Sequence, residues 1–273
     1  MGINRVILDW FDELAESGTF EGKSSVLELG PQDFFFSGED ITAVANRRLK
    51  GHKVGEAVSL ICNTSVHFRE KQAAFYSLFG LQDYQSTDQY DKRADFNFDL
   101  NQCQGSPKKY DVIVDSGTNE HVFNAANVFV FTHNSLNEGG IALKILPTYG
   151  DNTHGFFNIH PTVYFDVARV NGYRILDFRY IDDMSGRSKE RGIESMISKE
   201  DFERGLTSFA GSAALQSRIS QNFAQNLDRA ITRGSQGQAH FCVDYCCVAM
   251  QKIKDQPFCY PGQGVYLTEF GNS

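Results

Sequence analysis

The stretch Ser25-Val-Leu-Glu-Leu-Gly-Pro-Gln-Asp33 is a short apolar run that ends abruptly in a glycine and an acidic residue. A second stretch, Tyr110-Asp-Val-Ile-Val-Asp-Ser-Gly-Thr-Asn-Glu-His121, has the same design. A buried parallel strand has this appearance where its carboxyl end opens onto a ligand crevice. Together with the later run Gly139-Gly-Ile-Ala-Leu-Lys-Ile-Leu-Pro147, these endings predict a nucleotide-like cofactor lying across one edge of a sheet.

Segments with strand-like and helix-like apolar spacing alternate along the chain. The expected strands are 24–30, 83–88, 95–100, 110–115, 141–146, 173–181 and 240–252. The expected helices are 3–17, one that starts after Ser37 as its cap, 67–80, 122–136 and 161–171, whereas 51–64 resembles a loop with a short apolar run. This alternation predicts an α/β protein with a Rossmann-like, doubly wound, mostly parallel seven-stranded sheet and helices on both faces. Crossovers of one hand would place the strand ends along one rim.

The whole chain, 1–273, is expected to form a single domain. We expect an N-terminal helix within 1–22, a cofactor-binding core at 24–181, a helical insertion at 182–237, and a final strand with a C-terminal segment at 238–273. The insertion is rich in Ser, Gln, Arg and Gly and precedes the last strand. It is either a lid over the site or a surface elaboration without a functional part, and both interpretations stay open.

Composition narrows the class of partner. The chain of 273 residues has a net charge of -8, with 26 basic residues scattered among 34 acidic ones, which argues against nucleic acid as a partner. No apolar run approaches the ~20 residues of a membrane-spanning helix. The amino terminus resembles an amphipathic helix and not a signal peptide, so a cytoplasmic protein is expected. The sequence does not indicate an oligomeric state.

The six cysteines include a group near the carboxyl end, namely Cys242, Cys246, Cys247 and Cys259, which lies close to His240 in the sequence. Such a group suggests a zinc site. However, Cys246 and Cys247 are adjacent on an expected strand, so their side chains would point to opposite faces. No Cys-x-x-Cys pair occurs, and buried thiols acting as small hydrophobic residues are the favoured interpretation.

Polar residues at the strand ends are candidates for cofactor contacts. Gly30 allows a tight turn and close approach of a ligand, and Glu28 shares its face, where a carboxylate could orient a positively charged cofactor group. Asp88 could accept two hydrogen bonds from a ribose diol. Asp99 could accept one from an adenine amino group, with Leu100 as apolar surface for the ring. Taken alone, Asp88 and Asp99 are better explained as solvated turn aspartates, and Gly30 is a weak signal because strand-ending glycines are common without any ligand.

The block from Asp115 to His121 places several polar groups in the expected crevice. His121 is the candidate general base because imidazole titrates near neutrality; the alternative is a structural histidine at a helix start. In the loop 152–161, His154 and His160 could bind a metal with His121, or the loop could be an aromatic flap over a pocket. No carboxylate-histidine spacing supports a metal, so none is expected.

These residues resemble the class I S-adenosylmethionine-dependent methyltransferases over about 24–181. Val26-Leu-Glu-Leu-Gly30 is similar to the first motif of that family, and Tyr110–Asp115, Glu120-His121-Val122 and the Gly139-Gly140 strand are similar to its fourth and fifth motifs. The resemblance implies S-adenosylmethionine as cofactor, with S-adenosylhomocysteine as product. The residues it places around the cofactor are Glu28, Gly30, Gln32, Asp88, Asp99, Leu100, Asp115, Ser116 and Gly117.

The chain departs from the family in its first loop, where Gln32 and Phe34 replace two customary glycines. The bulky loop 31–36 must hold the methionine moiety differently, or not at all. The expected function is methyl transfer to a small-molecule acceptor, with His121 as base and His154 near the substrate. The alternatives are a catalytically silent protein that keeps the fold and, ranked last because its Gly-x-Gly-x-x-Gly fingerprint is absent, a nicotinamide-dependent oxidoreductase.

Overall fold

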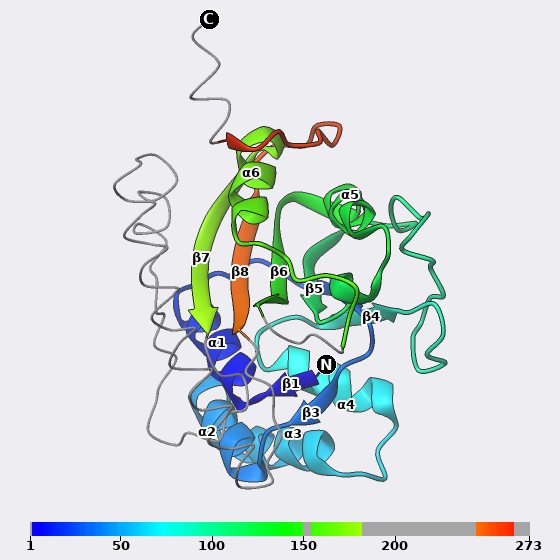
Figure 1. Ribbon diagram of the computed structural model, residues 1–273. Coiled ribbons are helices and arrows are strands. Elements are labelled where there is room, and N and C mark those ends of the chain that lie inside the picture. The colour runs from blue at the N-terminus through cyan, green and yellow to red at the C-terminus, as the bar shows by residue number, and fades with distance from the viewer. Residues whose placement is uncertain (1, 150–153, 182–243, 265–273) are drawn as a thin grey trace, which may run out of the picture.

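A computed structural model describes residues 2–149, 154–181 and 244–264 (Figure 1). Its strands are β1 (Gly2–Asn4), β2 (Ser25–Leu29), β3 (Asp33–Phe35), β4 (Asp83–Thr87), β5 (Tyr110–Ser116), β6 (Leu136–Tyr149), β7 (Tyr173–Ile181) and β8 (Asp244–Lys252). Its helices are α1 (Arg5–Glu16), α2 (Gly38–Arg48), α3 (His52–Cys62), α4 (Phe68–Ser77), α5 (Ala125–Ser135) and α6 (Thr162–Asn171), with a one-turn 3-10 helix η1 (Asn119–His121).

The main sheet has the strand order β4-β2-β5-β6-β8-β7. Neighbouring strands from β4 to β6 run parallel, whereas β8 is antiparallel to both β6 and β7. The register pairs Leu29 of β2 with Thr87 of β4 on one side and with Asp115 of β5 on the other. The carboxyl ends of these three strands therefore lie side by side, as the sequence predicts.

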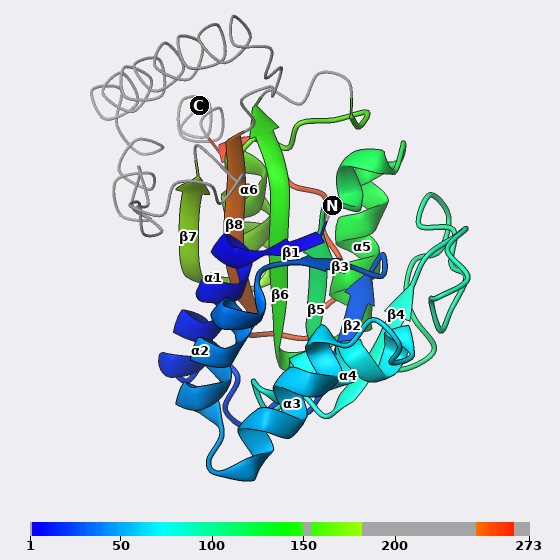
Figure 2. The same cartoon turned by 90° about the horizontal axis from the view of Figure 1, so that it is seen from below.

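Helices cover both faces of the sheet (Figure 2). One core joins α1, α2 and α4 to alternate strand residues such as Val26, Val114 and Cys247. The other joins α5 and α6 to the intervening residues, among them Leu27 and Cys246. The adjacent cysteines Cys246 and Cys247 thus lie in different cores and are both fully buried, as expected from strand alternation.

Local signals explain where the helices begin. The Ser37 hydroxyl accepts a hydrogen bond from the Asp40 amide, and the Asp40 carboxylate accepts one from the Ser37 amide. This reciprocal capping box starts α2 at the predicted place. The Asn4 side chain similarly accepts from the amide of Ile7 at the start of α1.

Three expectations need correction or stay open. Residues 51–64 are not a loop, since α3 occupies 52–62 with only Ile61 fully buried, and such a weak apolar face hid the helix. Residues 95–100 are not a strand, because Phe96 makes a single bridge to Thr87, so the described sheet has six strands and not seven. The expected insertion at 182–237 and the start of the last strand at 240–243 lie outside the described residues.

None of the helices that the structure describes is long and apolar enough to cross a membrane.

Candidate functional site

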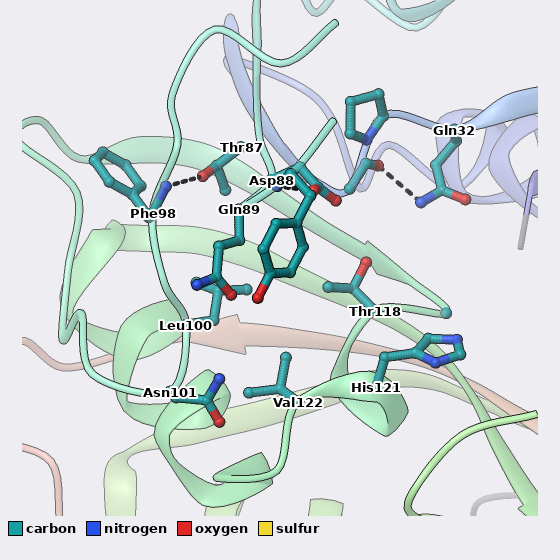
Figure 3. A pocket seen from close by; sticks show the side chains of 14 residues that line it. Gln32, Thr87, Asp88, Gln89, Phe98, Leu100, Asn101, Thr118, His121 and Val122 are labelled. Carbon is teal, nitrogen blue, oxygen red and sulfur yellow. Dashed lines mark hydrogen bonds between the residues drawn. The ribbon is translucent and has the colours of Figure 1, made fainter. Parts of the chain in front are cut away.

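A cavity of about 390 Å³ opens at the carboxyl ends of β2, β4 and β5 (Figure 3). Three segments line it: the turn after β2 (Gly30, Pro31 and Gln32), the segment that follows β4 (Thr87, Asp88, Gln89, Tyr90, Phe98, Leu100 and Asn101) and the turn after β5 (Gly117, Thr118, His121 and Val122). The volume falls in the range of small-molecule sites, roughly 300–1,000 Å³. A cavity therefore lies at the edge of the sheet where the sequence predicts a cofactor.

The turns after β2 and β5 touch each other at Gly30. Its φ is +74°, and a Cβ there would lie 2.6 Å from Thr118 Oγ1. The Thr118 hydroxyl in turn donates to the carbonyl of Leu29 at 2.6 Å. Only glycine fits both the backbone conformation and this close approach.

The aromatic part of the loop after β2 turns away from the cavity. Phe34 stacks on Phe36 with ring centroids 4.9 Å apart, and Phe34 lies 4.8 Å from the ring of Phe75 in the first core. The strand β3, which contains Phe34, pairs in parallel with β1 at the amino terminus. Neither Phe34 nor Phe36 lines the cavity, so the bulky loop leaves it open.

Gln32 takes the position of a customary glycine and faces the cavity. Its side chain is 3% exposed, and its Nε2 donates to the Gly30 carbonyl at 2.8 Å. Within the described part of the chain, its Oε1 has no hydrogen-bond partner. A buried polar atom normally has one. This oxygen is itself buried, so it is not exposed to the open space of the cavity.

Glu28 lies behind the turn and does not line the cavity. Its carboxylate accepts hydrogen bonds from the Tyr76 hydroxyl at 2.6 Å, from the Tyr84 hydroxyl at 2.8 Å and from the Gln32 amide at 3.2 Å. Complete burial raises the pKa of Glu28 to about 7, against the opposing effect of these hydrogen bonds. The structure thus places Glu28 as a support for the loop, not beside a cofactor cation.

The segment after β4 contributes Asp88 and Leu100 to the cavity but not Asp99. Asp88 Oδ1 accepts from the amides of Tyr90 and Asp91, and its Oδ2 points toward Gly30. The Asp99 carboxylate instead accepts from Asn101 and Gln102, and these bonds, led by those from Asn101, lower the pKa of Asp99. In Figure 3, Leu100 and Val122 lie across the cavity from Gln32.

Asp115 is buried under the turn after β5 and does not line the cavity. Its Oδ2 accepts from Lys144 Nζ at 2.9 Å, and both side chains are fully buried. Its Oδ1 accepts from the amides of Thr118 and Asn119. Ser116 is also buried outside the lining, whereas Gly117, with φ +81°, is part of it.

Two histidines meet at the edge of the cavity. The Nε2 atoms of His121 and His154 are 3.0 Å apart, and both residues are exposed. The carboxylate of the buried Glu120 lies in the same group, with one ligand atom of each residue within 4.8 Å of the others. His160, the other histidine of that loop, is not part of the group and bonds to Thr162.

The sequence interpretation did not single out Thr118, Phe98, Asn101 or Val122, which also line the cavity. Thr118 lies within the polar block Asp115–His121 and Val122 directly follows it, so their place in the sequence is the one signal that could have identified them. Phe98 and Asn101 belong to an irregular segment, and no periodicity shows where such a segment runs.

No protein-family model matches the chain, and no curated protein is similar enough in sequence to match it. Solved structures do align with it. The O-methyltransferase of a trans-AT PKS multienzyme from Brevibacillus brevis, in complex with S-adenosyl-L-homocysteine, is 16% identical, with 90% of this chain and 71% of that chain covered and a TM-score of 0.38.

Phosphoethanolamine N-methyltransferase 2 from Haemonchus contortus, in complex with phosphomonomethylethanolamine and S-adenosylhomocysteine, is 15% identical, with 89% of this chain and 52% of that chain covered and a TM-score of 0.41. At TM-scores below 0.5, such a likeness carries no functional argument, and function must be argued from the cavity itself. Both of these solved proteins are methyltransferases by name, and both are in complex with S-adenosylhomocysteine.

Proposed function

We propose that the chain binds S-adenosylmethionine in the cavity at the ends of β2, β4 and β5 and transfers its methyl group to a small-molecule acceptor. One observation carries the proposal. Residues that the motif resemblance assigns to the cofactor, namely Gly30, Gln32, Asp88, Leu100 and Gly117, line a single cavity although they come from three separate strand ends.

The lining offers a matching group for each part of the cofactor. Asp88 has a carboxylate oxygen directed into the turn region, which suits ribose hydroxyls. Leu100 and Val122 offer apolar surface for an adenine ring. At the other side of the cavity, Gln32 lies beside the expected place of the methionine moiety, and rotation of its side-chain amide would let Oε1 accept a hydrogen bond from the ammonium. The Gln32 side chain would then make the contact with the methionine moiety that the exposed backbone of a glycine loop makes.

When bound, the cofactor supplies an activated methyl group on a sulfonium centre. The methyl carbon would go to the acceptor's lone pair, and the electron pair of the broken carbon–sulfur bond would stay on sulfur. The protein's part is to align the two reactants and to exclude misaligned poses. If the acceptor is protonated, one proton must leave, and His121 is the histidine of the lining that can take it.

A crystal structure with S-adenosylhomocysteine soaked in tests this proposal. We expect the adenine ring against Leu100 and Val122 and the amino acid moiety at Gln32. The space beside the sulfur would then show the size and polarity of the acceptor.

A second candidate, a catalytically silent protein with the same fold, is favoured by Gln32 and Phe34 at the glycine positions. Crystals that leave the cavity empty, together with no binding in solution, would support this second candidate and contradict the first.

A further inference from the structure

The turn after β5 and the loop that leads into α6 are clamped together at Glu120. The Glu120 carbonyl accepts hydrogen bonds from the amides of Phe156 and Phe157, at 2.7 and 3.3 Å. Gly155 lies so close that a Cβ on it would come within 2.8 Å of that carbonyl oxygen and 2.9 Å of Glu120 Cγ. This contact fixes His154 beside Glu120 and His121, although the loops are far apart in sequence.

The clamp brings together a carboxylate and two imidazoles. His121 Nε2 and His154 Nε2 face each other at 3.0 Å, with the ring planes at 71°. Two nitrogen ligands at about 2.0–2.1 Å from one zinc ion lie about 2.9–3.4 Å apart for angles between square and tetrahedral. The carboxylate of Glu120 is within 4.8 Å of the nitrogen ligands, and both imidazoles are exposed.

We propose that Glu120, His121 and His154 bind a divalent transition-metal ion at the edge of the cavity. Two imidazoles and one carboxylate form a ligand set that favours Zn²⁺, Fe²⁺ or Co²⁺ over Mg²⁺ or Ca²⁺, which prefer oxygen ligands. Three protein ligands leave coordination positions for water or for an oxygen of a substrate. Because His121 lines the cavity, those positions lie next to it.

Glu120 is buried, with 0% of the residue exposed, and it places a carboxylate beside the two exposed imidazoles. An ion held by His121 and His154 would add positive charge on the side of Glu120 that faces them. A plain histidine–histidine hydrogen bond also explains the 3.0 Å distance, and the metal titration distinguishes the two.

The expectation of a metal-free site rested on spacing along the chain, where no carboxylate-histidine pattern stands out. The sequence suggests His121, His154 and His160 as the possible ligands. In the folded chain Glu120 lies with His121 and His154, and His160 lies outside the group. With an ion bound, the Nε2 lone pair of His121 would be donated to the ion and could not take a proton. The ion would instead promote loss of the proton by lowering the pKa of an acceptor oxygen bound to it. The proposal does not depend on methyl transfer.

Metal titration of the full chain tests the proposal. The protein is stripped with a chelator and dialysed, Zn²⁺ binding is measured by calorimetry, and Co²⁺ binding is followed by visible absorption. We expect one equivalent with micromolar or tighter affinity. His121→Ala and His154→Ala should each weaken binding at least tenfold, and Glu120→Gln should do the same if it folds.

His160→Ala is the matched control, because it removes an exposed histidine of the same loop outside the group, and it should bind like the wild type. Both ligand histidines are also exposed, so circular dichroism should show an intact fold in their variants. No binding tighter than millimolar would overturn the proposal. So would unchanged binding in His121→Ala and His154→Ala, which would place any bound metal elsewhere, for example at the carboxyl-terminal cysteines. Since no cofactor is present, this result is independent of S-adenosylhomocysteine binding.

Discussion

Lys144 Nζ donates to Asp115 Oδ2 at 2.9 Å, and neither side chain has any exposed surface. Lys144 also donates to the Thr132 hydroxyl at 3.0 Å and lies 5.0 Å from the centre of the Phe129 ring. The other oxygen of Asp115 caps the turn at Thr118, which borders the cavity. The buried ion pair between Asp115 and Lys144 therefore stabilises the turn after β5.

Asp115→Ala should lower the free energy of unfolding by about 3–5 kcal/mol, because it leaves the Lys144 ammonium buried without its counter-charge. Urea unfolding measures the change. The control is Lys108→Ala, which breaks a pair of similar length (2.8 Å) with Asp83 at the surface and should change stability by at most about 1 kcal/mol. Equal, small effects of both variants would mean that the buried pair does not stabilise the fold.

The stability of the protein should depend on pH through Glu28. Its pKa is raised by burial from 4.5 to about 7, so between these values the folded state keeps a proton that the unfolded state loses. The free energy of unfolding should therefore fall as pH rises from about 4.5 to about 7 and level off above. The difference between the two pKa values corresponds to a loss of about 3 kcal/mol in the free energy of unfolding.

Glu28→Gln removes this titration while keeping an acceptor oxygen for one of the two tyrosines, Tyr76 or Tyr84. Measured by urea unfolding at several pH values, the variant should gain stability relative to the wild type across the same window. Parallel pH profiles for the two proteins would show that Glu28 stays ionised in the fold.

Gly30→Ala should abolish or strongly weaken cofactor binding, since its Cβ would clash with Thr118 and reshape both turns of the cavity. Gly22→Ala is the matched control. Gly22 has a similar φ of +69°, but a Cβ there meets nothing within 4 Å. Both variants should lose roughly 1 kcal/mol of stability from the backbone conformation, whereas only Gly30→Ala should lose affinity for S-adenosylhomocysteine. Unchanged affinity in Gly30→Ala would place the cofactor elsewhere.

His121→Ala should lower turnover with an identified acceptor by about 10²–10⁴-fold, the usual contribution of a positioned acid–base group. Its effect on the dissociation constant of S-adenosylhomocysteine should be small, because the histidine lies at the edge of the cavity beyond the groups that match the cofactor. Steady-state kinetics and calorimetry on the same preparation measure both quantities. Equal losses in turnover and affinity would indicate a structural histidine.

The sequence predicts the strand ends well because buried parallel strands leave a clear pattern of apolar run, glycine and acid. Asp88 reaches the cavity directly after β4, and His121 reaches it from the turn after β5. However, the position of a residue along a strand does not show whether its side chain lines the cavity or is buried in the core. Glu28 and Asp115 stand at the expected edge, yet Tyr76 and Lys144 from distant parts of the chain draw their carboxylates into the core.

Other features depend on contacts that no local pattern encodes. Asp99 is directed to its own turn by Asn101 and Gln102, and the residues around it form no strand. The meeting of His154 with Glu120 requires the close approach of Gly155, which becomes visible only when both loops are placed.

Calorimetry with S-adenosylhomocysteine tests the central claim, a cofactor cavity at the ends of β2, β4 and β5, most directly. We predict micromolar or tighter binding to the wild type. Asp88→Asn keeps the capping oxygen but loses the charge facing the ribose, and it should bind roughly tenfold to a hundredfold more weakly. Asp99→Asn, outside the cavity lining, should bind like the wild type. No detectable heat with the wild type, or equal affinity in Asp88→Asn, would contradict the account.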